Sequence, residues 1–182
     1  MTPARLAMIR LLPFLPLAAA CMPVPALSSP AAAQQQRPRS IVPILLDAHN
    51  RARAAVGSAA LAWDPVLAAS AADHADQLAR EGRLRHSPKQ QRPGVGENLW
   101  IGTRGVFAIE TMVGGWTSER SLFRRGTFPN TSRTGRWSDV GHYTAIIWPT
   151  TNRLGCAIGR SPRWEGLVCR YAPKGKIDGV AI

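Results

Sequence analysis

The hydrophobic pattern changes its period once along the chain, and this change limits the folds that the chain can adopt. Three segments with apolar residues at helical spacing come first: 41–57, 64–82 and 106–119. Three short runs rich in apolar, β-branched or aromatic residues follow them: 143–148, 154–158 and 167–171. Helices followed by strands predict an α+β domain built in layers, because alternating βαβ units would need the two kinds of segment to alternate.

Residues at the segment ends support this division. Ser40 can cap the first helix, and Asp64 followed by Pro65 is typical of a helix start, with Gly82 at the end of the same segment. Prolines and glycines predict a loop over 83–96. From 122 to 140 no periodicity is present, and so long a connection is usually functional or mobile. The last two runs, 154–158 and 167–171, predict an antiparallel hairpin.

The composition is that of one globular domain with an excess of basic residues. The 182 residues include 23 Lys and Arg against 11 Asp and Glu, a formal charge of +12, and 45% are hydrophobic. This hydrophobic content excludes a disordered chain, and a chain of this length buries enough surface to fold without a metal or a disulfide. If the protein contains a metal or a disulfide, that feature therefore has a role beyond making folding possible.

The N-terminal segment predicts export. Arg5 and Arg10 precede an apolar run and then small residues, which is the order of a secretory signal peptide. We expect a signal peptide over 1–33, cleaved before Gln34, a linker over 34–39 and one domain over 40–182. The alternative is a lipoprotein signal that ends before Cys21 and leaves a lipid anchor there. The signal peptide predicts a secreted, extracellular or periplasmic protein, and the alternative predicts a protein that is lipid-anchored at Cys21. Export in either case excludes nucleic acid as a partner.

The cysteine count predicts one disulfide. Of three cysteines, only Cys156 and Cys169 lie beyond the signal peptide, 13 positions apart. In an oxidising compartment such a pair favours a disulfide over two buried thiols. Closing a loop of this length would stabilise the fold by about 3 kcal/mol in the chain-entropy account.

Four histidines are the main candidates for chemistry. His49, with Asn50, lies on the first helix and is expected to bond it to neighbouring loops, whereas His74 is expected on a solvated helix surface. His86 follows the second helix, eleven residues before Glu97. His142 starts an apolar run predicted as a strand, where an inward polar residue needs a partner.

Several of these residues lie in short motifs that follow one another in a fixed order along the chain. Residues 141–148, Gly-His-Tyr-Thr-Ala-Ile-Ile-Trp, resemble a signature of the CAP superfamily of cysteine-rich secretory proteins, venom allergens and plant pathogenesis-related proteins. Further matches are His49-Asn50-x-x-Arg53, Gly96-Glu97-Asn98-Leu99, Leu154-Gly155-Cys156-Ala157 and Val168-Cys169-Arg170-Tyr171-x-Pro173. The chain is similar to a single-domain, bacterial-type member of this superfamily.

The resemblance implies a three-layer α-β-α sandwich with a central antiparallel sheet. It also implies a surface cleft in which two histidines and two glutamates converge: His86, Glu97, Glu119 and His142. His86 and His142 would be the ligands of a Zn²⁺ ion, with Glu97 or Glu119 as the base of a hydrolase. The alternative is a hydrogen-bonded polar cluster that holds loops onto the sheet. Ser87 adjoins His86, but no nucleophile motif surrounds it.

Two positions depart from the family pattern. Arg170 stands where the family commonly has Asn, and Lys176 follows Lys174-Gly175 where plant members often have Pro-Gly-Asn. The second departure argues against release of a C-terminal signalling peptide.

A basic segment follows the expected site. It contains five arginines and no acidic residue before Asp139: Arg120, Arg124, Arg125, Arg133 and Arg136. Such a loop can meet anionic lipids or cell-envelope polymers, or it can simply be solvated. Phe123 and Phe128 in the same segment can either touch a membrane or anchor the loop.

Three functions follow from these observations. We favour a non-enzymatic binding domain for a lipid, a sterol-like molecule or an anionic envelope ligand. The first alternative is a zinc-dependent hydrolase that uses the same cleft. The second is an envelope or host-surface interaction protein that acts through the Arg120 to Arg136 loop.

Overall fold

The computed structural model describes residues 40–182. The expected signal peptide, its alternative cleavage before Cys21 and the linker lie outside the described residues. The helices are α1 (Ile41–Ala54), α2 (Pro65–Glu81), α3 (Ile109–Ser118) and the short α4 (Gly141–Ile147). The strands are β1 (Ala62–Trp63), β2 (Gly96–Thr103), β3 (Arg153–Arg160) and β4 (Trp164–Ala172). Within residues 40–182, no helix has both the length and the hydrophobicity needed to cross a bilayer.

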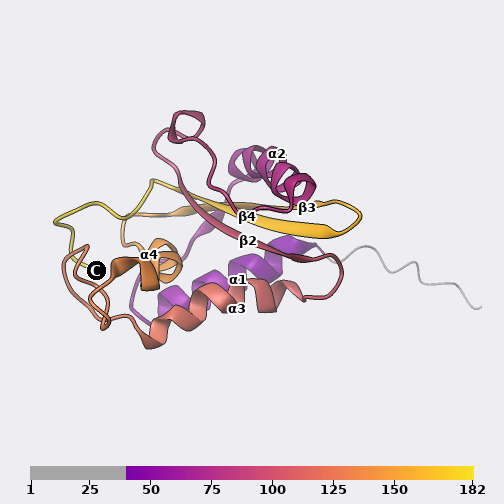
Figure 1. The fold of residues 1–182 in the computed structure, drawn as a ribbon. Helices are drawn as coiled ribbons and strands as arrows, with labels where there is room; N and C mark the ends of the chain where they lie inside the picture. Colours follow the sequence, from indigo (N-terminus) through magenta and orange to yellow (C-terminus); the bar gives the residue numbers. More distant parts are fainter. Residues whose placement is uncertain (1–39) are drawn as a thin grey trace, which may run out of the picture. The chain divides into compact units, whose positions relative to one another are not determined.

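One four-stranded sheet with the order β1-β3-β4-β2 forms the middle layer. β4 pairs antiparallel with both β3 and β2, and the two-residue β1 adds a short parallel edge to β3. Helix α2 covers one face of the sheet, and α1 and α3 cover the other (Figure 1). The α+β class and the α-β-α sandwich expected from the sequence are confirmed.

Residues of β3 alternate between the two faces. Gly155 and Gly159 lie under α2, where a Cβ atom would come within 2.2 Å of the backbone of that helix. Only glycine therefore lets α2 approach the sheet so closely. Cys156 faces the larger core beneath α1 and α3, where it is paired in register with Cys169 of β4. The two cysteines form a disulfide, as predicted.

The first two helices begin and end close to where the sequence predicts. The Asp64 carboxylate accepts hydrogen bonds from the backbone N–H groups of Val66 and Leu67 and caps α2, which ends at Gly82 with φ of 63°. The third helix is shorter than predicted. It begins at Ile109, and Phe107 before it is exposed.

The strand predicted for 143–148 is wrong, because this run forms most of α4. Each of its six residues is at most 3% exposed. A short run that is buried on all sides shows no alternation, so periodicity cannot separate helix from strand. His142 therefore lies in the first turn of a helix. Strand β2, which carries Glu97, was not predicted, because its Gly, Glu and Asn residues hide the strand pattern.

The fully buried guanidinium of Arg53 fastens the end of α4 to α1. It donates hydrogen bonds to the carbonyl oxygens of Ile146 (2.8 Å), Trp148 (2.9 Å) and Thr151 (2.8 Å), and to that of Ala59. The carbonyls of Ile146, Trp148 and Thr151 lie at and beyond the end of α4, where they have no partner within that helix. The arginine of the His49-Asn50-x-x-Arg53 motif thus has a structural role.

His49 bonds α1 to the sheet rather than only to loops. Its ring nitrogens contact the carbonyl oxygen of Leu45 (2.7 Å) and the hydroxyl of Tyr171 on β4 (2.9 Å). Burial lowers the pKa of His49 to about 4, against the effect of the Leu45 carbonyl, so the ring is neutral at physiological pH. Asn50, by contrast, bonds the loop at Leu61, as predicted.

His74 is not the solvated residue that the sequence suggested. It is 6% exposed, and its Nε2 contacts the carbonyl oxygen of Arg85 at 2.8 Å. This contact holds the chain after α2, directly before His86. The Arg85 carbonyl thus gives the buried imidazole of His74 the hydrogen-bond partner that a buried polar group requires.

Candidate functional site

Glu97 is the centre of the first polar cluster. Its buried carboxylate accepts hydrogen bonds from Ser87 N–H (3.0 Å), Ser87 Oγ (2.8 Å) and His86 Nδ1 (2.9 Å). Arg170, its cross-strand partner on β4, approaches Oε2 to 3.4 Å, and Arg92 Nε lies 3.6 Å from Oε1. Arg170, which departs from the family pattern, therefore contributes a charge directly to this cluster.

These contacts determine the ionisation of Glu97. Burial raises the pKa of the Glu97 carboxyl, but the hydrogen bonds from His86 and Ser87 and the charge of Arg92 outweigh burial and lower the pKa to about 2. A carboxylate with so low a pKa is a weak base. The geometry suits Glu97 for orienting the imidazole of His86 more than for accepting a proton.

Glu119 and His142 form the second polar cluster. Glu119 lies in the 3₁₀ turn (Glu119–Ser121) that follows α3. Its Oε2 accepts hydrogen bonds from the N–H groups of His142 and Tyr143, both at 2.9 Å, and so caps the start of α4. Its Oε1 contacts His142 Nδ1 at 2.5 Å, and the ring of His142 stacks on Trp116 with centroids 5.9 Å apart. Glu119 is thus the partner that His142 was expected to need.

The four expected site residues are thus arranged as two imidazole–carboxylate pairs. In each pair the carboxylate contacts Nδ1 of the histidine, so Nε2 is the nitrogen that remains for a ligand. Among residues 40–182, no group of three or more His, Cys, Asp or Glu side chains converges to hold a metal ion. A metal at this site would therefore depend on two imidazoles and on water.

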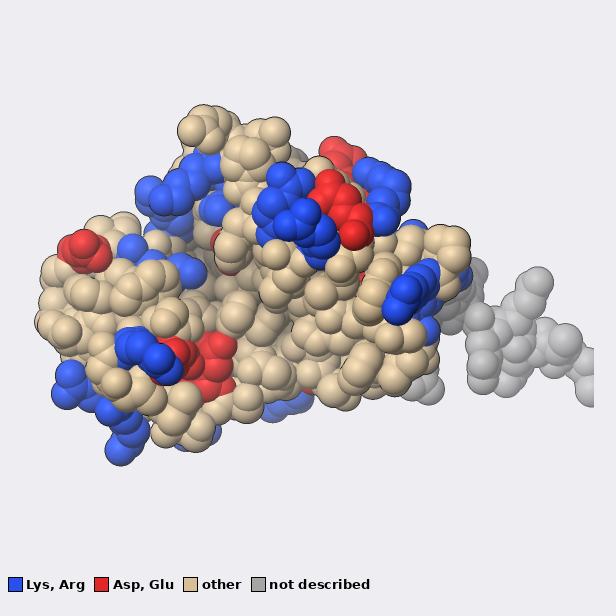
Figure 2. All heavy atoms as spheres, in the orientation of Figure 1, with Lys and Arg blue, Asp and Glu red and all other residues tan. Residues whose placement is uncertain are grey.

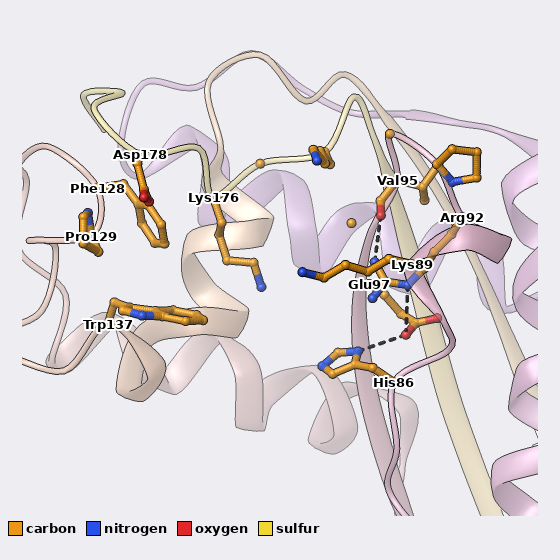
Figure 3. A pocket seen from close by; sticks show the side chains of 15 residues that line it. His86, Lys89, Arg92, Val95, Glu97, Phe128, Pro129, Trp137, Lys176 and Asp178 are labelled. Atoms are coloured by element: carbon orange, nitrogen blue, oxygen red, sulfur yellow. Dashed lines mark hydrogen bonds and ion pairs between the residues drawn. The ribbon is translucent and has the colours of Figure 1, made fainter.

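A cavity of about 650 Å³ opens beside the first pair (Figure 3). His86, Lys89 and Arg92 lie on one side of this cavity, around Glu97.

Phe128, Pro129 and Trp137 form an apolar wall on the opposite side of the cavity, and Trp137 is 44% exposed. Lys174 and Lys176 also line the cavity. The cavity thus combines an apolar wall with several cationic side chains.

Several of these lining residues were missed at the sequence level. Lys89, Arg92 and Trp137 lie in segments without periodicity, and nothing in the sequence indicates that these segments meet. Lys176 was singled out only as a departure from the family pattern. The structure brings it to the cavity from the segment after β4.

The basic segment exposes its arginines but not its phenylalanines. All five arginines are exposed, whereas Phe123 and Phe128 are 8% and 5% exposed. Phe123 packs against Tyr143 and Phe128 against Trp148, so both anchor the loop. Figure 2 shows Lys and Arg side chains in several separate groups on the visible face.

The comparisons with known proteins agree on one family. The model of the "Cysteine-rich secretory protein family" (CAP) matches residues 46–171. Pathogenesis-related protein PR-1 type from Sambucus nigra is 35% identical over 135 residues, which cover 74% of this chain and 77% of that protein. Pathogenesis-related protein 1C from Nicotiana tabacum is 37% identical over 135 residues, covering 74% and 76%. The crystal structure of NaASP2 with Zn²⁺ has the same fold, with a TM-score of 0.66, 23% identity and coverage of 81% of this chain and 87% of that one.

The ionisation of Glu97 leads to a prediction for Glu97→Gln. The folded state holds the carboxylate with a pKa of about 2, below the ordinary value of 4.5, so its contribution to stability is complete above about pH 4.5 and is lost as the pH falls towards 2. This difference corresponds to about 3 kcal/mol. Denaturant unfolding should show Glu97→Gln as strongly destabilised near neutral pH, with the gap to the parent narrowing by about 3 kcal/mol towards pH 2.

The control is Glu81→Gln, which removes an exposed carboxylate that contacts Gln77 and Arg85. Its unfolding free energy should stay close to that of the parent. A gap between Glu97→Gln and the parent that does not change with pH would contradict the low pKa of Glu97.

Proposed function

The chain belongs to the CAP, or cysteine-rich secretory protein, family, and on this premise we propose that it is an exported, non-enzymatic binding domain. Its ligand is an amphipathic molecule from the cell envelope, with a lipid-like or sterol-like part and an anionic group. The observation that carries this proposal is the cavity beside Glu97, where an apolar wall with Trp137 faces cationic side chains. Its volume of about 650 Å³ lies in the range of small-molecule sites.

The bonding of the two glutamates supports binding more than hydrolysis. Glu97 accepts four hydrogen bonds and Glu119 accepts three. The pKa of Glu97 is lowered to about 2, so this carboxylate has little basicity left for activating water, and the oxygens of Glu119 are engaged in capping α4 and contacting His142. Ser87 donates to Glu97, and the cysteines form the disulfide, so none of these is poised as a nucleophile.

A zinc-dependent hydrolase is the second candidate function, and the imidazole–carboxylate pairs favour it. A carboxylate on Nδ1 fixes the ring and leaves Nε2 basic, which is the usual arrangement around histidine ligands of metals. His86 and His142 would hold Zn²⁺, and the bound ion would supply Lewis-acid activation of water. Two imidazoles fit such an ion only if water completes the coordination, since residues 40–182 bring no third ligand close.

Amphiphile binding is tested by calorimetric titration of dodecanoate, and of dodecanol as the uncharged match, into the purified, delipidated protein. We expect saturable binding of dodecanoate at one site and weaker binding of dodecanol. Trp137→Ser should weaken dodecanoate binding by about tenfold, because it removes the exposed aromatic surface of the apolar wall. Phe107→Ser, which removes an aromatic residue that is 41% exposed and does not line the cavity, should have no effect. Failure of both ligands to bind would refute the proposal.

Zinc binding is tested by titrating Zn²⁺ into the metal-stripped protein. Binding at one site that disappears in the double variant His86→Ala/His142→Ala is the result that the hydrolase requires. Because the two histidines lie in separate oriented pairs and residues 40–182 bring no third ligand close, we expect weak binding, with Kd above about 1 μM. Tight binding that depends on both histidines would favour the second function and justify a search for a hydrolysed substrate.

A further inference from the structure

The backbone of Lys176 is in a conformation that lysine rarely adopts. Its φ is 59°, and no other non-glycine residue among 40–182 has a positive φ. The preceding Gly175 fixes the chain, because a Cβ atom there would lie 2.5 Å from the ring of Trp148. A hydrogen bond from Lys174 N–H to the Gly94 carbonyl holds it further. Glycine would satisfy this φ without strain, so the lysine side chain needs a reason other than the turn.

The side chain of Lys176 enters the cavity. Its ammonium lies 5.8 Å from the centroid of the Trp137 ring, which is the distance of a cation–π contact. Burial and the charge of Arg92 lower the pKa of the Lys176 ammonium, and the charge of Glu119 raises it. Lys176 lines the cavity together with three residues of the first polar cluster, His86, Arg92 and Glu97.

A second ammonium approaches from the opposite side. Figure 3 shows the side chains of Lys89 and Lys176 pointing toward one another, with the ring of His86 below Lys89. Neither ammonium has a hydrogen bond or ion pair with another described side chain. Two ammonium groups that converge without an acid between them repel each other. An anion between them would remove this repulsion.

The acids of the cavity do not neutralise these lysines. The cavity is lined by four Lys and Arg side chains and by two acids, Glu97 and Asp178. Glu97 is already bonded by Ser87 and His86, with two arginines beside it. Asp178 lies at the far end of the cavity, near Phe128 (Figure 3). The space between Lys89 and Lys176 is thus left with an excess of positive charge.

We infer that Lys89 and Lys176, with His86, bind a phosphate monoester group whose apolar or ring-shaped substituent lies against Trp137 and Phe128. A phosphate monoester carries close to two negative charges at neutral pH, which matches two ammonium groups better than one carboxylate does. Its three terminal oxygens can accept hydrogen bonds from several donors at once. This inference rests on the proposed binding function and specifies the charged part of its ligand.

The test compares ligands that differ in one part each. The purified, delipidated protein is titrated calorimetrically with 1-naphthyl phosphate, 1-naphthyl sulfate and inorganic phosphate. We expect one-site binding of 1-naphthyl phosphate, with affinity at least about tenfold higher than for the singly charged sulfate or for phosphate without the ring. Equal affinity for the phosphate and sulfate esters would overturn the proposal.

Variants of the two lysines locate the site. Lys89→Gln and Lys176→Gln should each weaken binding of 1-naphthyl phosphate by about tenfold or more, since each removes a charged hydrogen bond. Arg124→Gln removes the same charge from an exposed residue outside the cavity and should leave the affinity unchanged. If Arg124→Gln weakens binding as much as the lysine variants do, binding follows net charge and the site is refuted.

Lys176→Gly separates ligand binding from a structural role. Glycine fits the positive φ, so the variant should melt at a temperature no lower than the parent while losing affinity for 1-naphthyl phosphate. A clear fall in melting temperature together with unchanged affinity would show that Lys176 serves the fold and would overturn the inference.

Vesicles of phosphatidylcholine with and without phosphatidic acid identify the source of the phosphate. Binding to phosphatidic acid that 1-naphthyl phosphate displaces and Lys176→Gln weakens would assign a lipid headgroup to the site. Binding of 1-naphthyl phosphate without vesicle binding would assign a soluble phosphate monoester. If dodecanoate binds but 1-naphthyl phosphate does not, the proposed function stands and the phosphate site alone is refuted.

Discussion

Buried polar side chains connect the layers of this fold, and each depends on partners from another element. Arg53 of α1 donates hydrogen bonds to carbonyls at and beyond the end of α4, and His49 of the same helix contacts Tyr171 of β4. Asn98 of β2 donates to Tyr171 Oη and to the carbonyl oxygen of His142. An unpaired group at any of these positions would cost about 1–3 kcal/mol, so the elements are fixed relative to one another. The family motifs in the sequence are largely these residues.

The same requirement for partners shapes the candidate site. Glu97 is buried in β2, and Ser87, His86 and Arg170 meet its need for donors. Glu119 obtains its hydrogen-bond donors from the N–H groups at the start of α4 and from the ring of His142. Both carboxylates thereby position a histidine, and the low pKa of Glu97 makes that carboxylate a weak base. What remains open to a ligand is the cavity with its apolar wall and its lysines, which is suited to recognition.

Local patterns predicted the parts of the fold that depend on neighbours in sequence. Asp64, Pro65 and Gly82 mark the ends of α2, and the hairpin of β3 and β4 follows from two short runs with Cys156 and Cys169 in register. The strand predicted at 143–148 was wrong because a short run that is buried on all sides shows no alternation, so periodicity cannot separate a helix from a strand. β2 was missed because its residues include Glu and Asn, whose partners come from distant segments.

The site was predictable only to the extent that the family resemblance supplied it. The resemblance named His86, Glu97, Glu119 and His142, and the structure shows which glutamate contacts which histidine. The convergence of Lys89 with Lys176 depends on the packing of residues that lie 87 positions apart in the sequence, for which spacing gives no signal.

The most direct measurement is a map of backbone amide chemical shifts in the purified protein as 1-naphthyl phosphate is added. Our account predicts that the largest changes fall at 86–97 and 174–176, the two segments that carry the cationic side of the cavity. Changes concentrated in the arginine-rich segment 120–136, with the cavity unaffected, would contradict it and make that loop the binding surface.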